Sequence, residues 1–206
     1  MPYAINQMPF DIGATAGVSA LADEVHWEGA LFEVPDKDYT IGTNPIKARV
    51  ATDSQNATKI VRCVRNNSGI ALLPGRIVRY KAGSEGFRVD GYTCTTAERG
   101  AGIVDPFLPA AGVADKDLFY ITVNGCDAVL TSLTANEEAV FSAGSVLIAL
   151  TAATSQATTA GRVTAQDLTG ATALLGNQLQ NRIGVALSAS TTANTNSSKL
   201  TRLMFW

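Results

Sequence analysis

Residues 118–130 have the sequence LFYITVNGCDAVL, and this stretch carries the clearest local structural signal in the chain. Two runs of strand-forming residues, 118–123 and 126–130, flank the pair Asn124-Gly125. Asn-Gly between two such runs is the strongest short hairpin signal, because both central residues of the preferred turn need a positive φ angle, which Asn and Gly tolerate. The sequence therefore predicts two antiparallel strands joined by a turn at Asn124-Gly125.

Further strands are predicted on both sides of this stretch. Residues 58–65 (TKIVRCVR) are rich in β-branched residues and end at a cluster of turn formers. Residues 76–80 are expected to face residues 87–90 across a glycine-bearing loop, which predicts a second hairpin. Three later islands have strand character and are separated by Thr-, Ser- and Asn-rich tracts: GRVTA at 161–165, RIGVALSA at 182–189 and KLTRLMFW at 199–206. Short strands, frequent turns and no alternation of strands with long helices predict a mainly β chain, folded as an antiparallel β-sandwich or a small β-barrel.

The first quarter of the chain has a different composition. Residues 1–55 scatter Gly, Pro and Asp among isolated aromatic residues, so we expect an extended, irregular N-terminal arm, followed by a β-rich domain over residues 56–206. Residues 18–27 (VSALADEVHW) have the composition of a short helix within this arm. Two alternatives stay open for the arm: it lies on another protein or protomer, or it folds back onto the β-rich domain of its own chain.

Composition and charge narrow the classes of function. The chain has 206 residues, of which 46% are apolar, so a core without disulfides or metal is expected. Charged residues make up 17%, against about 25% in a typical soluble domain. Sixteen basic and eighteen acidic residues give a net charge of −2, whereas a protein that neutralises many phosphates needs a basic excess. This composition indicates no nucleic-acid partner and favours a protein that packs against other protein over an enzyme.

No membrane segment or secretion signal is predicted. The longest apolar stretch, residues 145–153, is shorter than the roughly 20 residues that span a bilayer, and the first ten residues lack the features of a signal peptide. The three cysteines, Cys63, Cys94 and Cys126, are far apart in the sequence. Their odd number without a signal peptide predicts reduced, buried thiols in a protein made in a cytosol.

Few residues suggest catalysis or metal binding. His26 is the single histidine and adjoins Trp27, so we expect a packed or interface residue and not a general base. The cysteines lack zinc-ligand spacing. Two Asp-Lys-Asp triplets, at 36–38 and 115–117, lack the further acids of a calcium loop and are interpreted as turns capped by Asp. The sequence therefore predicts no catalytic residue, no metal site and no cofactor.

A group of arginines falls on the predicted strands of residues 58–90, and we expect it to be solvated or paired across an interface. Its members are Arg62, Arg65, Arg76, Arg79 and Arg88.

Four short motifs and a closing apolar strand together carry a resemblance. The motifs are LPGRIV at 73–78, AGSVL at 143–147, GRV at 161–163 and RIGVALSA at 182–189. In this order they resemble the small capsid decoration (cement) proteins of tailed bacteriophages, over roughly residues 58–206. The resemblance implies a β-rich structural protein of the virion, without enzymatic activity, that is assembled in the host cytoplasm. It further implies that the protein sits on the capsid exterior, often as a homotrimer, and stabilises the capsid by bridging major capsid protein subunits.

Aromatic residues are the expected contacts under this hypothesis, because a clamp between subunits benefits from aromatic anchors and from little charge at the centre of its contacts. The candidates for contact with the capsid or with another protomer are Phe10, Trp27, Phe32, Phe205 and Trp206. The alternative function is a receptor- or carbohydrate-binding module of a virion fibre or tail, for which Tyr, Trp and the Asn/Thr-rich loops would serve. A hydrolase using an acidic pair such as Asp115 and Asp117 is the third hypothesis.

Overall fold

The computed structural model describes residues 3–4, 8–16, 27–35, 58–84, 86–91, 100–130, 142–149, 161, 163–165, 182–187, 189 and 198–205. Within these ranges the chain forms eleven strands and no helix. The strands are β1 Tyr3–Ala4, β2 Leu31–Pro35, β3 Thr58–Asn66, β4 Ile77–Arg79, β5 Arg88–Val89, β6 Gly100–Val104, β7 Leu118–Leu130, β8 Val146–Ala149, β9 Val163–Ala165, β10 Arg182–Ala186 and β11 Ser198–Met204.

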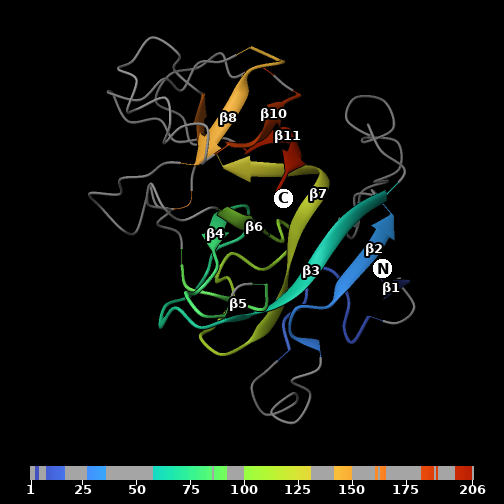
Figure 1. Cartoon of the computed structure of the whole chain (residues 1–206), viewed down its shortest axis with the longest axis vertical. Helices are drawn as coiled ribbons and strands as arrows, with labels where there is room; N and C mark the ends of the chain where they lie inside the picture. The colour runs from blue at the N-terminus through green and yellow to red at the C-terminus, as the bar shows by residue number, and fades with distance from the viewer. Residues whose placement is uncertain are drawn as a thin grey trace.

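The strands belong to one sheet with the order β1-β2-β3-β7-β11-β10-β8-β9, as Figure 1 shows. Most pairings among the described strands are antiparallel, and of these pairings only the short β1–β2 and β3–β5 are parallel. β6 pairs with β7, and β4 pairs with β6. The mainly β fold predicted from the sequence is therefore confirmed, and the described strands do not close into a barrel. The described residues contain no helical segment with the length and hydrophobicity needed to cross a membrane.

β7 connects the two halves of the sheet, and here the predicted hairpin is wrong. Its first half pairs with β3 up to Asn124, and its second half pairs with β11 from Asn124 onward, so the strand is continuous through Asn124-Gly125. A two-residue hairpin of the type expected for Asn-Gly needs positive φ at both residues. Only Gly125 has one, at 106°. In addition, Val123 is an extra residue relative to β3, because Thr122 faces Val61 and Asn124 faces Ile60. This β-bulge and the glycine bend the strand without reversing it.

The ladder of β3 and β7 is buried on both faces because their side chains alternate between two clusters. On one face, Val64 of β3 and Phe119 and Ile121 of β7 pack under β4 and β6. We call this group the β4–β6 cluster; its buried members are Val64, Leu72, Val78, Val89, Ala101, Val104, Leu108, Val113, Phe119 and Ile121. The opposite face is covered by the N-terminal cluster, whose buried members are Phe32, Val34, Val61, Cys63, Leu118 and Tyr120.

The described part of residues 1–55 lies on this chain's own sheet. β2 pairs with β3 along its whole length, and residues from segments 8–16 and 27–30 pack against the N-terminal cluster. Backbone hydrogen bonds fix these segments: Gly29 donates to the carbonyl of Cys63 at 2.8 Å, and Ala16 donates to that of Leu118 at 3.0 Å. Of the two alternatives for the arm, the described residues adopt the folded-back arrangement. The helix predicted over residues 18–27 lies outside the described residues except for Trp27.

The second half of the sheet has its own core, and the predicted strands within 161–165, 182–189 and 199–206 are confirmed there. We call it the β8–β11 cluster; its buried members are Ile77, Ile103, Leu147, Ala149, Val163, Ile183, Ala186 and Leu203. Phe205 packs against it. The hairpin predicted between residues 76–80 and 87–90 is also confirmed, because Tyr80 bridges Val89 and Lys81 donates to Arg88 at 2.9 Å.

Candidate functional site

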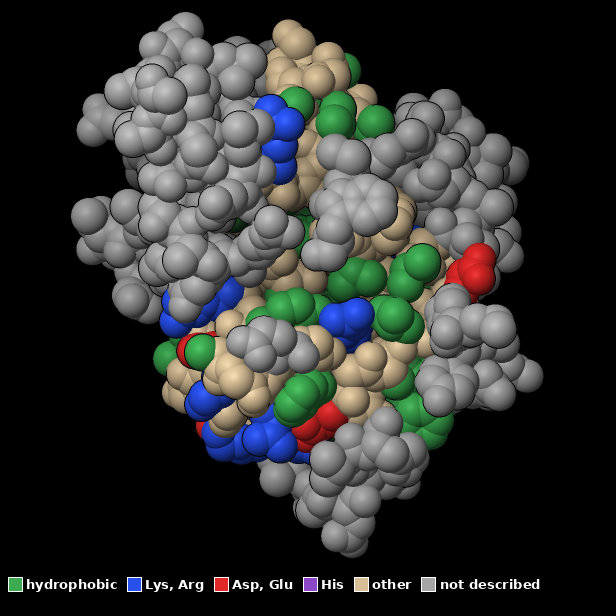
Figure 2. Space-filling model, viewed as in Figure 1, with side chains coloured by type: hydrophobic (Ala, Val, Ile, Leu, Met, Phe, Trp, Pro, Cys, Tyr) green, Lys and Arg blue, Asp and Glu red, His purple; other side chains and the backbone are tan. Residues whose placement is uncertain are grey.

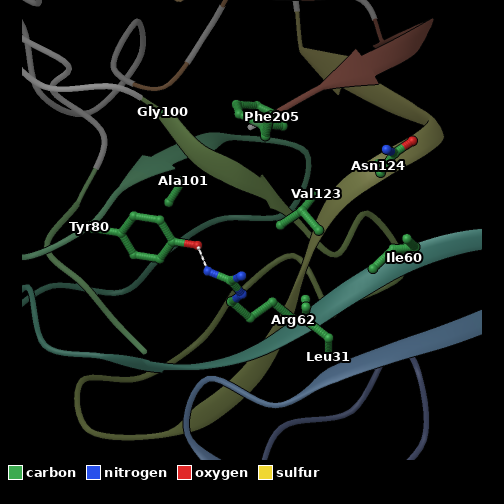
Figure 3. A pocket seen from close by; sticks show the side chains of 9 residues that line it. All are labelled: Leu31, Ile60, Arg62, Tyr80, Gly100, Ala101, Val123, Asn124 and Phe205. Carbon is green, nitrogen blue, oxygen red and sulfur yellow. Dashed lines mark hydrogen bonds between the residues drawn. The ribbon is translucent and has the colours of Figure 1, made fainter. Parts of the chain in front are cut away.

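A surface pocket of about 230 Å³ lies where β7 bends, between the β4–β6 and β8–β11 clusters. Its lining comes from β2, β3, β6 and β7 and from the residues that directly follow β4 and β11, and Figure 3 shows these side chains. The lining residues are Leu31, Ile60, Arg62, Tyr80, Gly100, Ala101, Val123, Asn124 and Phe205.

Strand geometry places these side chains together. Ile60 and Arg62 are two residues apart on β3 and so share a face, while Val61 between them points into the N-terminal cluster. The register of β2 against β3 sets Leu31 opposite Arg62, which brings both to the pocket. The bulged Val123 interrupts the regular ladder of β7 at the same place. The pocket is thus a consequence of the bend, where the two halves of the sheet separate.

The polar centre of the pocket is the pair Arg62 and Tyr80. The Nη1 group of Arg62 donates a hydrogen bond of 2.6 Å to the Tyr80 hydroxyl oxygen, drawn as the dashed line in Figure 3. The guanidinium carbon also lies 5.8 Å from the centre of the Tyr80 ring. The Nε of Arg62 is buried without a hydrogen-bond partner. Burial raises the pKa of Tyr80, and the neighbouring Arg62 charge opposes that rise, so the phenol keeps its proton at neutral pH.

Phe205 forms the wall of the pocket toward β11. Its backbone N–H donates to the carbonyl of the bulged Val123 at 3.3 Å, which fixes the chain just after β11. The ring fits against Gly100, where a Cβ atom would lie only 2.9 Å from the ring carbon Cε1. Any larger residue at Gly100 would therefore displace Phe205 and reshape the pocket.

A second charged group lies around Glu28, whose side chain is 2% exposed. Its carboxylate binds Arg65 Nε and, at 3.1 Å, Arg88 Nε. Several Lys and Arg side chains, coloured blue, gather on the lower left of the face in Figure 2. The prediction that these arginines are solvated or paired across an interface is wrong for Arg65, which is 12% exposed at its side chain and binds Glu28 of its own chain. Glu28 thereby attaches the N-terminal region to β3 and β5.

The second Asp-Lys-Asp triplet is confirmed as a turn. Asp115 accepts a 2.9 Å hydrogen bond from the Gly69 backbone, which holds the pKa of that carboxyl below its usual range. Lys116 has a positive φ of 75°, and Asp117 donates to the carbonyl of Ala114 at 3.2 Å. Among the described residues, no group of three or more His, Cys, Asp or Glu side chains is placed to hold a metal ion. The triplet at 36–38 and His26 lie outside the described residues.

Cys63 is a buried free thiol in the N-terminal cluster, as the sequence predicted. Burial, with a smaller contribution from the negative charge of Glu28, raises the pKa of this thiol to about 12. A thiol that stays protonated is a poor nucleophile, so Cys63 serves packing. Cys94 and the side chain of Cys126 lie outside the described residues.

Of the five predicted contact residues, three lie at this chain's own core, one lines the pocket and one is outside the described residues. Phe32 has no exposed surface and meets Tyr120 edge-on, with 5.8 Å between ring centres. Phe10 stacks on Tyr120 at 4.5 Å, and Trp27 lies 5.9 Å from Phe32, so these three aromatic residues contact this chain's own core. Phe205 is half-buried and lines the pocket, whereas Trp206 lies outside the described residues. Contact of these five residues with the capsid or with another protomer stays a prediction.

Sequence reasoning missed the pairing of Arg62 with Tyr80. In the sequence, Arg62 is one of five arginines in residues 58–90, and it lies between the apolar Val61 and Cys63 on a predicted strand. That alternation places the arginine on the opposite face from Val61 and Cys63. Nothing in the sequence indicates which residue of a distant strand it meets.

Comparison with known proteins identifies no family. No protein-family model matches the sequence, and no curated protein matches it significantly.

Proposed function

We propose that this chain is a structural virion protein that binds the outer surface of a tailed-phage capsid as a homotrimer. In that place it bridges neighbouring subunits of the major capsid protein and stabilises the shell, without enzymatic activity.

One observation carries the proposal: the segments that resemble decoration proteins meet in space. Ile77, Leu147, Val163 and Ile183 come from the four motifs at 73–78, 143–147, 161–163 and 182–189, and all four are buried in the β8–β11 cluster. Leu203 of the closing strand completes this core. The resemblance therefore covers residues that build one structural unit, which supports a likeness of fold more than scattered short matches would.

The packing of β7 suits a protein that holds other subunits in place. β7 hydrogen-bonds to β3, β6 and β11, so it ties the two halves of the sheet to one continuous strand. If bound subunits pulled the two halves of the sheet apart, the force would be shared by many backbone hydrogen bonds at once. Clusters on both faces of β3 and β7 protect these bonds from water.

Co-sedimentation with capsid shells that lack this protein tests the proposal. Purified chain is mixed with undecorated heads of the phage that encodes it, at about 0.1 M and about 1 M salt, where the Debye length falls from about 10 Å to about 3 Å. We expect saturable binding at both concentrations, because contacts that are mainly apolar are weakly screened. Absence of the folded chain from the shell pellet would refute the proposal and favour the receptor- or carbohydrate-binding alternative, which glycan-array binding would then test.

A further inference from the structure

The pocket at the bend of β7 presents two neighbouring hydrogen-bond donors, Arg62 and Tyr80, for which the described residues supply no further acceptor. The Arg62 side chain makes a single hydrogen bond within the described part of the chain, to Tyr80, and has no carboxylate partner there. The Tyr80 oxygen accepts that bond, so its own proton remains available to a further acceptor. Arg65, Arg79 and Arg88 differ, because each pairs with a carboxylate of this chain.

An anion is the ligand that such a pair of donors accommodates. Partial burial removes some of the water that solvates a guanidinium, and this costs free energy. Without a nearby negative charge, no attraction offsets that cost. A carboxylate placed against Arg62 supplies the counter-charge, and its two oxygens can accept from both Arg62 and the Tyr80 hydroxyl. Since Tyr80 stays protonated at neutral pH, both donors are present under ordinary conditions.

The walls and the size of the pocket restrict what carries this carboxylate. Leu31, Ile60, Val123 and the ring of Phe205 surround the polar pair with apolar surface. Its volume of about 230 Å³ is below the range of about 300–1,000 Å³ that drug-sized ligands occupy. One acidic side chain with an apolar neighbour fits these walls better than a large cofactor does.

From this geometry we infer that the pocket is a docking site for an acidic side chain of the partner shell protein, with Arg62 and Tyr80 binding its carboxylate and an apolar neighbouring residue packing on Val123 and Phe205. This inference rests on the proposed function for the identity of the partner. The chemistry of the pocket is testable without that partner.

The first test uses a small probe on the full chain. N-acetyl-Glu-Leu-amide is titrated against the ¹⁵N-labelled protein, with N-acetyl-Gln-Leu-amide as its neutral isostere. We expect saturable shifts of the backbone amides of Arg62 and Val123 with the Glu probe, and at least about tenfold weaker binding of the Gln probe, because a charge-assisted bond is replaced by a neutral one. Equal binding of the two probes, or no saturable shift with either, overturns the inference.

The second test uses undecorated shells and matched variants. Arg62→Gln should weaken shell binding by about 30-fold or more, since loss of one partner of a buried charge pair at an interface has effects of that size. Tyr80→Phe removes only the hydroxyl and should weaken binding about tenfold, which keeps the test valid if Arg62→Gln does not fold. Arg182→Gln removes the same charge from the exposed start of β10 and should bind as the unmodified chain does.

The outcomes separate the two proposals. If the unmodified chain does not bind shells, the proposed function fails, while the dipeptide result still decides the chemistry of the pocket. If the unmodified chain binds shells and both Arg62→Gln and Tyr80→Phe bind equally well, the inference fails and the proposed function stands. A change in oligomeric state of Arg62→Gln in sedimentation velocity would assign the pocket to contact between copies of this chain, which also overturns the inference.

Discussion

Replacing Phe32 with alanine tests whether the N-terminal region is part of the core. The side chain has no exposed surface, and its ring lies 5.8 Å from that of Tyr120 and 5.9 Å from that of Trp27. Substitutions of buried Phe by Ala cost about 3–5 kcal/mol, because apolar contact is lost and a cavity remains. That is a large share of the roughly 5–15 kcal/mol by which domains are stable. For a chain of this length, the melting temperature should fall by about 6–20 °C, at about 2–4 °C for each kcal/mol.

Equilibrium unfolding in urea, monitored by fluorescence, measures this loss. Phe87→Ala is the matched control, because Phe87 is 36% exposed and packs loosely, with the Arg88 guanidinium 5.8 Å from its ring centre. We expect the control to lose about 1 kcal/mol or less. If Phe32→Ala is as stable as Phe87→Ala, then β2 does not contribute to the cooperative core, and the reasoning about the N-terminal region is wrong.

Three further predictions concern stability. Gly102→Ala should cost about 1–3 kcal/mol, because the added Cβ would lie 2.8 Å from the Thr122 carbonyl oxygen. A urea midpoint of Gly102→Ala equal to that of the unmodified chain would contradict the close packing of β6 on β7. Glu28→Gln should lower the free energy of unfolding by about 3 kcal/mol, since it leaves the buried Arg65 without its carboxylate. Asp90→Asn is the control and should cost under about 1 kcal/mol, because its pair with Arg79 is partly exposed. Equal losses for the two variants in urea unfolding would refute this prediction. Folding raises the pKa of Cys63 from 9.0 to about 12, so between these pH values the folded chain keeps a proton that the unfolded chain releases. The free energy of unfolding should therefore decrease as the pH rises from 9.0 toward about 12. Urea titrations at about pH 8 and about pH 10.5 check this, and Cys63→Ala should show a smaller decrease; an unchanged pH dependence would count against the burial of the thiol.

Strand positions were the most predictable part of the fold. Residues 58–65 are rich in β-branched residues, and β3 occupies Thr58–Asn66. The late strands were predicted equally well, because polar tracts bound the apolar islands that form β9, β10 and β11. These features are local: they depend on the backbone preferences of neighbouring residues and on the period of two in a strand.

The candidate pocket was not predictable in the same way. Phe205 was expected to make contacts beyond the chain, and Arg62 was expected to be solvated or paired across an interface. In the structure both line one pocket with Tyr80, although 143 positions separate Arg62 from Phe205. Which distant side chains meet depends on strand order and register, which no local pattern specifies.

The sequence by itself determined that this chain is mainly β, where most of its strands lie and that Cys63 is buried. The tertiary structure decided what happens at Asn124-Gly125. The dipeptide permits a turn, but β3 and β11 pair with β7 on the two sides of it, so a bulge at Val123 and a positive φ at Gly125 bend one continuous strand. The physical reason is that hydrogen bonds to two partner strands outweigh the modest preference of two residues for reversing the chain, and the pocket exists because of that bend.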